Sequence, residues 1–294
     1  MIALLFVLEY QYIFWIIIKF MSDSTTVNFS KAISGDYRIP IKAIFLEAWY
    51  RVKGMKAAFW LGFLYFILVM AAACLVLGLI LALYDVFILS LASAQNAGFL
   101  YNLKLGLKFI VVAVVEVLRF LFTASLAYMA LQHLRQQAIH GNMVFAFRHA
   151  WRPLLIIALL LYLFNSFILS GTNILLHSAL FKQQLVFLGS GFGSIFLLLI
   201  FFICFFLYFY FSVLVYMTVL LILDQKLSWK ESLSLAFQSV NQHFFKNVGL
   251  IIVTSLVFGL LALMTLGIGL IWLLPMTSLV TAIQYNQIFC EGNL

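Results

Sequence analysis

The sequence predicts an all-α integral membrane protein with six transmembrane helices in three hairpins, each preceded by an amphipathic helix at the cytoplasmic surface. Three observations support this fold class. Of the 294 residues, 66% are hydrophobic and 9% are charged, whereas soluble proteins have about 45–50% apolar and about 25% charged residues. Six apolar runs are long enough to cross a bilayer, and cationic residues gather in alternate connections between them. A soluble fold could not cover this much apolar surface, so the bilayer must be part of the solvent.

The chain begins with an apolar segment, 1–20, for which the sequence allows two interpretations. Polar residues including Glu9 and Lys19 interrupt it, no cation precedes it and no small-residue cleavage site follows, so it does not resemble a signal peptide. Either translation begins at Met21, where an ordinary polar start follows, or the segment is a signal anchor with its N-terminus outside. Residues 21–40 are expected to form a polar cytoplasmic tail.

Residues 41–289 are predicted to form one six-helix membrane domain, followed by a short tail, 290–294. A span needs about 20 apolar residues, because roughly 30 Å of hydrocarbon is crossed at about 1.5 Å per residue. Gly267 and Gly269 are expected to form a tight external turn between the last two runs, and a kink at Pro275 is tolerable in the sixth helix. The predicted spans are Ala57–Tyr84, Leu107–Leu131, Pro153–Leu176, Gly193–Leu223, Val248–Leu266 and Leu270–Gln287.

Lysine and arginine residues are distributed unequally between the two sides of this domain. Twelve precede the first, third and fifth spans, and three lie in the other connections. This positive-inside bias places both termini in the cytoplasm. The formal net charge of +8 does not indicate a nucleic-acid groove, because no basic stripe alternates with aromatic residues outside the spans. The twelve are Lys31, Arg38, Lys42, Arg51, Lys53, Lys56, Arg135, Arg148, Arg152, Lys226, Lys230 and Lys246, and the three are Lys104, Lys108 and Lys182.

Each predicted unit (41–131, 142–223 or 228–289) begins with a short amphipathic segment. Pro40 suits the start of the first helix, Asn142 is the expected N-cap of the second, and Ser228 forms a capping box with Glu231 in the third. All three start on the same side, so a true triplicate would have an axis along the membrane normal, although composition alone could produce the similarity. The predicted apolar stripes are Ile41, Ile44, Phe45, Ala48, Trp49 and Val52; Met143, Phe147, Ala150 and Trp151; and Trp229, Leu233, Phe237, Val240 and Phe244.

Cations and tryptophans beside these stripes are typical of helices that lie in a membrane interface. Each cation near an anionic surface contributes roughly 1 kcal/mol to binding. The lipid bilayer and its anionic head groups are therefore the expected partners, together with a membrane protein or a second copy of the chain. The predicted lipid-surface contacts are Lys42, Trp49, Arg51, Lys53, Arg148, Trp151, Arg152, Trp229 and Lys230.

The last quarter of the chain, about Tyr216–Phe289, is similar to the C-terminal half of poorly characterised bacterial multi-pass proteins. These include the membrane region attached to some glycerophosphodiester phosphodiesterases. The catalytic barrel of those enzymes has no counterpart here, so their activity cannot be carried over, and the resemblance implies a bacterial inner-membrane protein of unassigned function. Mitochondrial carriers also contain three two-helix repeats, but their P-x-[DE]-x-x-[KR] signature is absent from the odd-numbered spans. The resemblance rests on Leu223-Asp224, Leu227–Leu233, Ser239-Val240, Gly267-Ile268-Gly269, Pro275, Ala282 and Tyr285.

Glu116 and Arg119 are the sharpest candidates for an intramembrane site, because both lie deep in the second predicted span. Each charge costs roughly 2.5–3.5 kcal/mol at a helix centre. Their i, i+3 spacing puts them on one face, where they can neutralise each other. The pair forms either an ion or proton relay in the bundle interior or a structural pair that fixes helix packing. Asn165 and Thr172, seven residues apart on the third span, could line the same interior.

The sequence contains no recognisable catalytic or cofactor motif. The five histidines lack metal-ligand spacing, and the three cysteines, Cys74, Cys204 and Cys290, are too widely separated for a CxxC pair. No cofactor and no nucleic acid is expected. The leading hypothesis is a non-enzymatic inner-membrane protein with an accessory or membrane-organising role. The alternative is a small solute or ion transporter or channel that uses Glu116 and Arg119.

Overall fold

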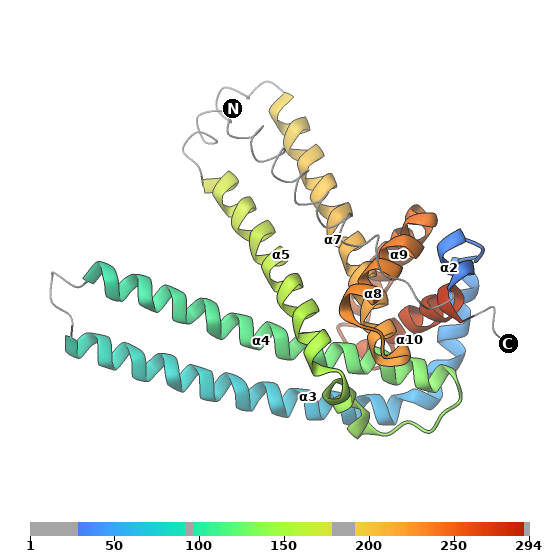
Figure 1. The fold of residues 1–294 in the computed structure, drawn as a ribbon, viewed down its shortest axis with the longest axis horizontal. Coiled ribbons are helices and arrows are strands. Elements are labelled where there is room, and N and C mark those ends of the chain that lie inside the picture. The colour runs from blue at the N-terminus through green and yellow to red at the C-terminus, as the bar shows by residue number, and fades with distance from the viewer. Residues whose placement is uncertain (1–28, 92–96, 178–191, 291–294) are drawn as a thin grey trace. The chain divides into compact units, whose positions relative to one another are not determined.

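The computed structural model describes residues 29–91, 97–177 and 192–290, and this part of the chain is helical, with no strand (Figure 1). The uncertain start, 1–20, and the last four residues lie outside the described residues. The helices are α2 (Ser30–Ser34), α3 (Ile41–Leu91), α4 (Ala97–Leu134), the 3₁₀ helix η1 (Gly141–His149), α5 (Trp151–His177), α7 (Phe192–Gln225), α8 (Trp229–Gln242), α9 (Phe244–Met264) and α10 (Leu270–Phe289).

Four stretches of helix in the described residues are long and apolar enough to cross a membrane. They are Ile41–Phe87, Asn102–Leu134, Phe202–Gln225 and Phe244–Met264. A fifth is formed if the bent pair η1 and α5, which meet at 92°, is one span. The predicted all-helical membrane architecture is confirmed at this level.

The chain divides into two compact units, and the boundaries fall inside helices α3 and α7. Unit 1 contains Met1–Val52 and Phe206–Leu294, and unit 2 contains Lys53–Phe205. The first boundary separates the predicted surface segment, 41–52, from the span that follows it. No helix break occurs there, so the prediction of a separate first surface helix is wrong. Its residues are good helix formers and Gly54 alone is too weak a breaker to end the helix.

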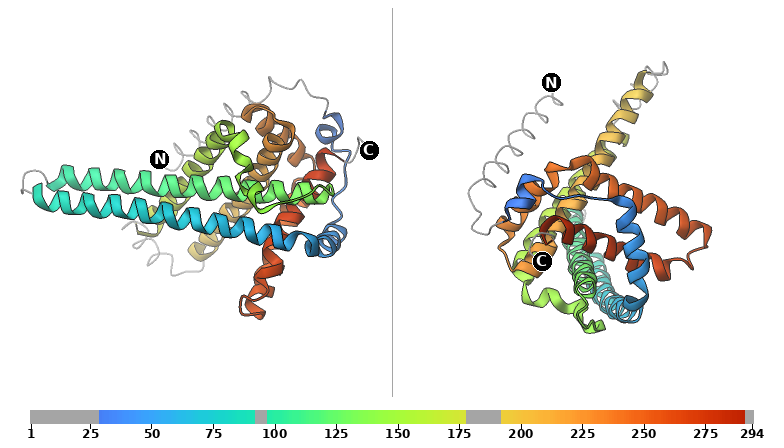
Figure 2. Two further views of the ribbon diagram at one scale, coloured as in Figure 1. Left: turned by 90° about the horizontal axis from the view of Figure 1, so that it is seen from below. Right: turned by 90° about the vertical axis from the view of Figure 1, so that its right-hand side faces the viewer.

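Unit 2 contains a long hairpin of α3 and α4, which lie side by side in Figures 1 and 2. Lys104 Nζ lies 2.8 Å from Asp85 Oδ1 near the hairpin end, and the Tyr84 hydroxyl donates to the Leu100 carbonyl at 3.4 Å. Farther along, the rings of Phe66 and Phe122 are 5.3 Å apart. These contacts hold α3 and α4 together along the pair.

The second surface segment packs against this hairpin through two glycines. A Cβ on Gly141 of η1 would lie 2.6 Å from Leu61 Cγ, and a Cβ on Gly62 would lie 3.1 Å from the Gly141 carbonyl oxygen. The Phe147 N–H donates to the Ser125 hydroxyl at 3.1 Å and holds the far end of η1 on α4. The segment is separate from the span, as predicted, but it is a 3₁₀ helix with His140 at its N-cap, so the prediction of Asn142 there is wrong.

Unit 1 confirms the start of the third surface helix. The Ser228 hydroxyl accepts from the Glu231 N–H at 3.3 Å, and the Glu231 carboxylate accepts from the Ser228 N–H at 3.1 Å. This reciprocal pair is the predicted capping box. Helix α8 ends at Gln242, and α9 begins two residues later at Phe244.

The glycine-containing turn between α9 and α10 is also as predicted. Gly267 N–H donates to the Ala262 carbonyl at 2.8 Å and Leu266 N–H to the Leu263 carbonyl at 3.1 Å. These two bonds form a Schellman motif, and both Leu266 and Gly267 have positive φ, at 49° and 85°. The Gly269 N–H then donates to the Thr265 hydroxyl at 2.9 Å, which closes the turn.

Candidate functional site

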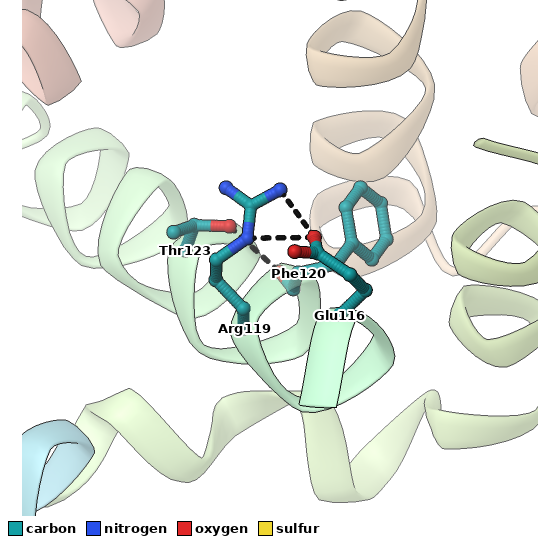
Figure 3. A network of polar contacts seen from close by, with 4 residues as sticks. All are labelled: Glu116, Arg119, Phe120 and Thr123. Atoms are coloured by element: carbon teal, nitrogen blue, oxygen red, sulfur yellow. Dashed lines mark hydrogen bonds and ion pairs between the residues drawn. The ribbon is translucent and has the colours of Figure 1, made fainter. Parts of the chain in front are cut away.

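The structure pairs the two charged residues that the sequence places in mid-span. Arg119 Nε and Nη2 donate to the same carboxylate oxygen, Glu116 Oε2, at 2.8 and 2.6 Å (Figure 3). Within the candidate span Asn102–Leu134, Glu116 lies 14 residues from the start and Arg119 lies 15 from the end, or about 21 and 22 Å. A turn later, the Thr123 hydroxyl donates back to the Phe120 carbonyl at 2.9 Å.

This pair lies on a partly exposed face of α4. The side chain of Arg119 is 52% exposed and that of Glu116 38%. Two charge-assisted bonds to one oxygen give a compact neutral pair, which lowers the cost of placing each charge in hydrocarbon. The predicted pairing is therefore present, whereas the described contacts connect the pair to no further titratable group.

Asn165 lies apart from the pair. The Tyr162 hydroxyl, three residues earlier on α5, donates to the Phe109 carbonyl of α4 at 3.2 Å, and Phe109 is seven residues before Glu116. Because Phe147, just before α5, contacts Ser125, α5 runs toward the N-terminal end of α4. Asn165 thus lies beyond the level of Phe109, away from Glu116. The side chain of Thr172 lies outside the described residues.

Four of the predicted lipid-contact residues form two cation–aromatic pairs at helix starts. The Arg152 guanidinium lies 5.5 Å from the ring centre of Trp151, and Lys230 Nζ lies 5.6 Å from that of Trp229. Trp151, Arg152 and Lys230 are exposed, and Trp229 is half-buried. Such pairs keep a charged group and an apolar ring together where a membrane changes from polar to apolar.

The other predicted contacts lie at the start of α3 and at the end of η1. Lys42, Trp49 and Lys53 are exposed, and so is Arg148. Arg51 is half-buried and its Nε donates to Glu47 Oε1 at 2.9 Å, an i, i+4 pair. Lys42, Lys53 and Arg148 thus lie at the protein surface.

The apolar stripe of the first surface segment is largely buried by protein, which corrects the prediction that it faces lipid. Ile44 and Ala48 are 0% exposed and Val52 is 2% exposed. The Phe45 ring packs edge-to-face on Phe258 of α9, with ring centres 5.7 Å apart. Trp49, 53% exposed, is the large member of this stripe that stays outside. An amphipathic pattern does not reveal whether lipid or protein covers the apolar side.

On α8 the buried face differs from the predicted one. It consists of small residues and one leucine at helical spacing, and of the predicted stripe only Val240 belongs to it. The other four predicted residues are half-buried. Serine and alanine let a neighbouring helix approach closely, a property that hydrophobicity does not register. The buried face is Ser232, Leu235, Ala236, Ser239 and Val240, each 0–1% exposed.

Unit 1 also contains a buried polar network that the sequence did not indicate. The Tyr37 hydroxyl donates to the Ser239 carbonyl at 2.5 Å and accepts from Asn247 Nδ2 at 3.2 Å. Gln284 Nε2 of α10 donates to Asn247 Oδ1 at 3.0 Å. Asn247 and Gln284 are both 0% exposed. The network ties four segments together: the connection before α3, helix α8, the start of α9 and the end of α10.

The segment before α3, predicted as a polar tail, is held against α8 by further bonds. Gln242 Nε2 donates to the Ile33 carbonyl at 2.8 Å, and His243 Nε2 lies 3.0 Å from the Gly35 carbonyl. The Tyr37 and His243 rings meet edge-to-face, with centres 4.9 Å apart. Partners separated by more than 200 residues leave no local signal in a sequence, so only the three-dimensional structure reveals this docking.

The described part of the chain contains no candidate metal centre. No group of three His, Cys, Asp or Glu side chains in the described ranges could hold a metal ion. Comparison with protein families, with curated proteins and with solved structures finds no match to this chain. The function must therefore be inferred from the chain's own surfaces.

Proposed function

We propose that this chain is a multi-pass protein of a bacterial inner membrane, with six spans and both termini in the cytoplasm. Its role is accessory: it organises anionic lipid, or a partner bound there, at the cytoplasmic surface, and it has no catalytic step. The resemblance of Tyr216–Phe289 to bacterial multi-pass proteins supports the location, and the unequal distribution of cations supports the orientation.

The observation that carries this proposal is the cation–tryptophan pair at the start of two apolar or amphipathic helices. Arg152 with Trp151 and Lys230 with Trp229 each place a positive charge beside an aromatic ring at a helix start. Lys42 and Lys53 are exposed as well, and each such cation attracts anionic head groups by roughly 1 kcal/mol. Trp rings prefer the same depth in the membrane.

The Glu116–Arg119 pair supports a structural role better than transport. A relay needs a group that accepts the next proton, and the described contacts of the pair end with each other. A neutral pair at mid-span instead lets α4 carry both charges in hydrocarbon. Glu116 and Arg119 therefore belong to helix placement in this proposal.

The proposal is tested by the lipids that surround the full chain after reconstitution. In vesicles with equal phosphatidylglycerol and phosphatidylcholine, the protein should extract a shell enriched in phosphatidylglycerol, measured by mass spectrometry of polymer-excised discs. The Lys42→Gln/Lys230→Gln variant should reduce this enrichment. Lys104→Gln/Lys108→Gln, which removes the same charge on the predicted external side, should leave the cytoplasmic enrichment intact. Equal loss in both variants, or no enrichment at all, would overturn the proposal.

A further inference from the structure

A cavity of about 780 Å³ lies beside η1 in unit 2, where the chain bends by 92° into α5. Tyr128 of α4 contributes one wall, and η1 contributes the remainder. Among its lining residues are Asn142, Arg148 and His149 on a polar side and Phe145 on an apolar side. Its volume is in the range of small-molecule sites, about 300–1,000 Å³.

The polar side of this cavity carries positive charge that no carboxylate of unit 2 balances. From Val117 to Leu223 the chain contains no Asp or Glu at all. Unit 2 has two acidic residues, and each is already paired: Asp85 with Lys104 and Glu116 with Arg119. The side chains of Arg148 and His149 are exposed and, with Asn142, offer several N–H donors to an anion.

Aromatic contacts fix the position of the Phe145 ring, against which an acyl chain could pack. The Phe145 ring lies 5.6 Å from Phe122 and 6.3 Å from Phe147, and 6.1 Å from Tyr65 of α3. The bond from Phe147 N–H to the fully buried Ser125 hydroxyl fixes η1 on α4. These contacts hold an aromatic ring in the same lining as Arg148 and His149, so the cavity suits a molecule with an anionic end and a hydrocarbon end.

We propose that this cavity binds one anionic phospholipid, with Arg148 and His149 donating to the phosphodiester and Asn142 to the head-group hydroxyls. The glycerol backbone and the first part of an acyl chain lie along Phe145. The amphiphilic lining and the position of the cavity, near the C-terminal end of the candidate span in α4 and just before α5 begins, favour a lipid over a soluble phosphate ester. This inference rests on the proposed function, in that η1 lies at the cytoplasmic membrane surface. It adds a single stoichiometric site to a general charged surface.

The test measures phosphatidylglycerol binding to the full chain in detergent by native mass spectrometry, with phosphatidylcholine as reference. The wild type should retain one phosphatidylglycerol after the others have dissociated. Arg148→Gln should weaken this binding at least tenfold. Arg152→Gln is the matched control, because it removes the same charge four residues away from an exposed arginine outside the cavity lining, and should change it less than twofold. Equal loss in both variants would overturn the cavity while leaving the charged-surface proposal standing.

A second variant separates the shape of the site from its charge. Ala146→Phe fills the cavity without altering the charge and should weaken binding of the retained lipid at least tenfold. Ala43→Phe, at an exposed position on α3, is its control. The probe sn-glycerol 3-phosphate should bind at least a hundredfold more weakly than the lipid. If it binds as tightly, the site belongs to a soluble phosphate ester and the lipid assignment is overturned; if Ala146→Phe binds like the wild type, the cavity is not the site.

Discussion

The ion pair between Glu116 and Arg119 determines what single substitutions on α4 should cost. Removing either partner leaves the other charge alone at mid-span, which costs roughly 2.5–3.5 kcal/mol on insertion scales. We therefore expect Glu116→Gln and Arg119→Gln each to lower the free energy of unfolding by about 2 kcal/mol or more, and the double variant to lower it by less than either. A double-mutant cycle in mixed micelles measures the coupling. Additive losses would show that the 2.6 Å contact contributes nothing.

Tyr37 gives unit 1 a predictable response to alkaline pH. Burial raises the pKa of its hydroxyl above the ordinary 10.0, and the hydrogen bond from Asn247 opposes this in part. Because the folded state holds this proton more tightly than the unfolded state, the stabilisation is complete below pH 10 and declines as the pH rises through the folded pKa. Tyr37→Phe has no hydroxyl to ionise, so it should not show this decline in unfolding free energy at alkaline pH.

The measurement compares melting temperatures of the wild type and Tyr37→Phe between about pH 9 and about pH 11. At about pH 9 the variant should melt at a lower temperature than the wild type, because the lost hydrogen bond to the Ser239 carbonyl costs about 1 kcal/mol of unfolding free energy. It should then lose less stability than the wild type over the alkaline range. Tyr50→Phe, at a side chain that is 73% exposed, is the control and should follow the wild type. Parallel pH curves for Tyr37→Phe and the wild type would contradict the prediction.

These two residue-scale features differ in how far the sequence could predict them. The spacing of Glu116 and Arg119 on one helix face was sufficient to predict their pairing. Tyr37 and Asn247 are 210 positions apart, and an Asn inside an apolar run does not identify its partner. Charged pairs on one helix are local, whereas amide networks between helices depend on tertiary packing.

At the scale of elements, η1 depends on the absence of side chains at its contact with α3. A Cβ at Gly141 would lie 2.6 Å from Leu61 Cγ and 2.9 Å from Leu61 Cβ, too close to the helix for a simple rotamer change. Gly141→Ala should therefore lower the free energy of unfolding by about 1–3 kcal/mol. Gly78→Ala, in α3 with nothing within 4 Å, should raise it by about 0.5–1 kcal/mol. Chemical unfolding of both variants checks the difference, and equal effects would contradict it.

The start of α8 gives a second test at this scale. Ser228→Ala removes the hydroxyl that accepts from the Glu231 N–H, and it should cost about 1 kcal/mol of unfolding free energy. Ser234→Ala, inside the same helix, removes instead a hydroxyl that accepts from Gln238 Nε2 at 3.1 Å, and it serves as the comparison for a side-chain bond that caps no helix. Thermal unfolding should rank Ser228→Ala below the wild type. No loss in that variant would mean that the 14-residue helix does not depend on its cap.

The three surface segments show which features of a helix its own sequence can predict and which depend on its neighbours. Two of the three start signals were informative, since α3 begins directly after Pro40 and Ser228 forms its capping box, whereas Asn142 is not the N-cap of η1. A capping box is a contact within four residues, so the sequence can reveal it. What covers each apolar stripe was not predictable. Ile44 and Ala48 meet protein rather than lipid, and α8 uses Ser232 and Ser239 as its buried side. Lipid and protein interiors are equally apolar, so hydrophobic periodicity alone cannot distinguish them.

At the scale of the whole molecule, the number of spans depends on α10. This helix is not among the four stretches that are long and apolar enough by themselves, and it contains Thr277, Thr281 and Gln284. Yet both threonine hydroxyls donate back to backbone carbonyls of their own helix, at 2.7 and 3.2 Å. Such bonds satisfy the hydroxyl donors within the helix itself, so the helix can cross hydrocarbon.

The geometry of unit 1 links α10 to α9. Gln284, near the end of α10, is bonded to Asn247, near the start of α9, while the tight turn at 265–269 joins their other ends. The two helices are therefore antiparallel over nearly their whole length, 21 and 20 residues. If α9 crosses the bilayer, α10 must cross back. Together with α3, α4, the bent pair and α7, this would give the six spans and the even count that we propose.

Labelling single cysteines with a membrane-impermeant maleimide in intact cells tests this topology, in a chain whose three native cysteines are replaced. Ile268→Cys, at the apolar turn where the side chain is 68% exposed, should react from outside. Gln137→Cys, exposed in the connection between α4 and η1, should react only after permeabilisation. A green fluorescent protein at the C-terminus should fluoresce, because α10 returns the chain to the cytoplasm. A protected Ile268→Cys together with a dark fusion would show that α9 and α10 do not form a spanning hairpin.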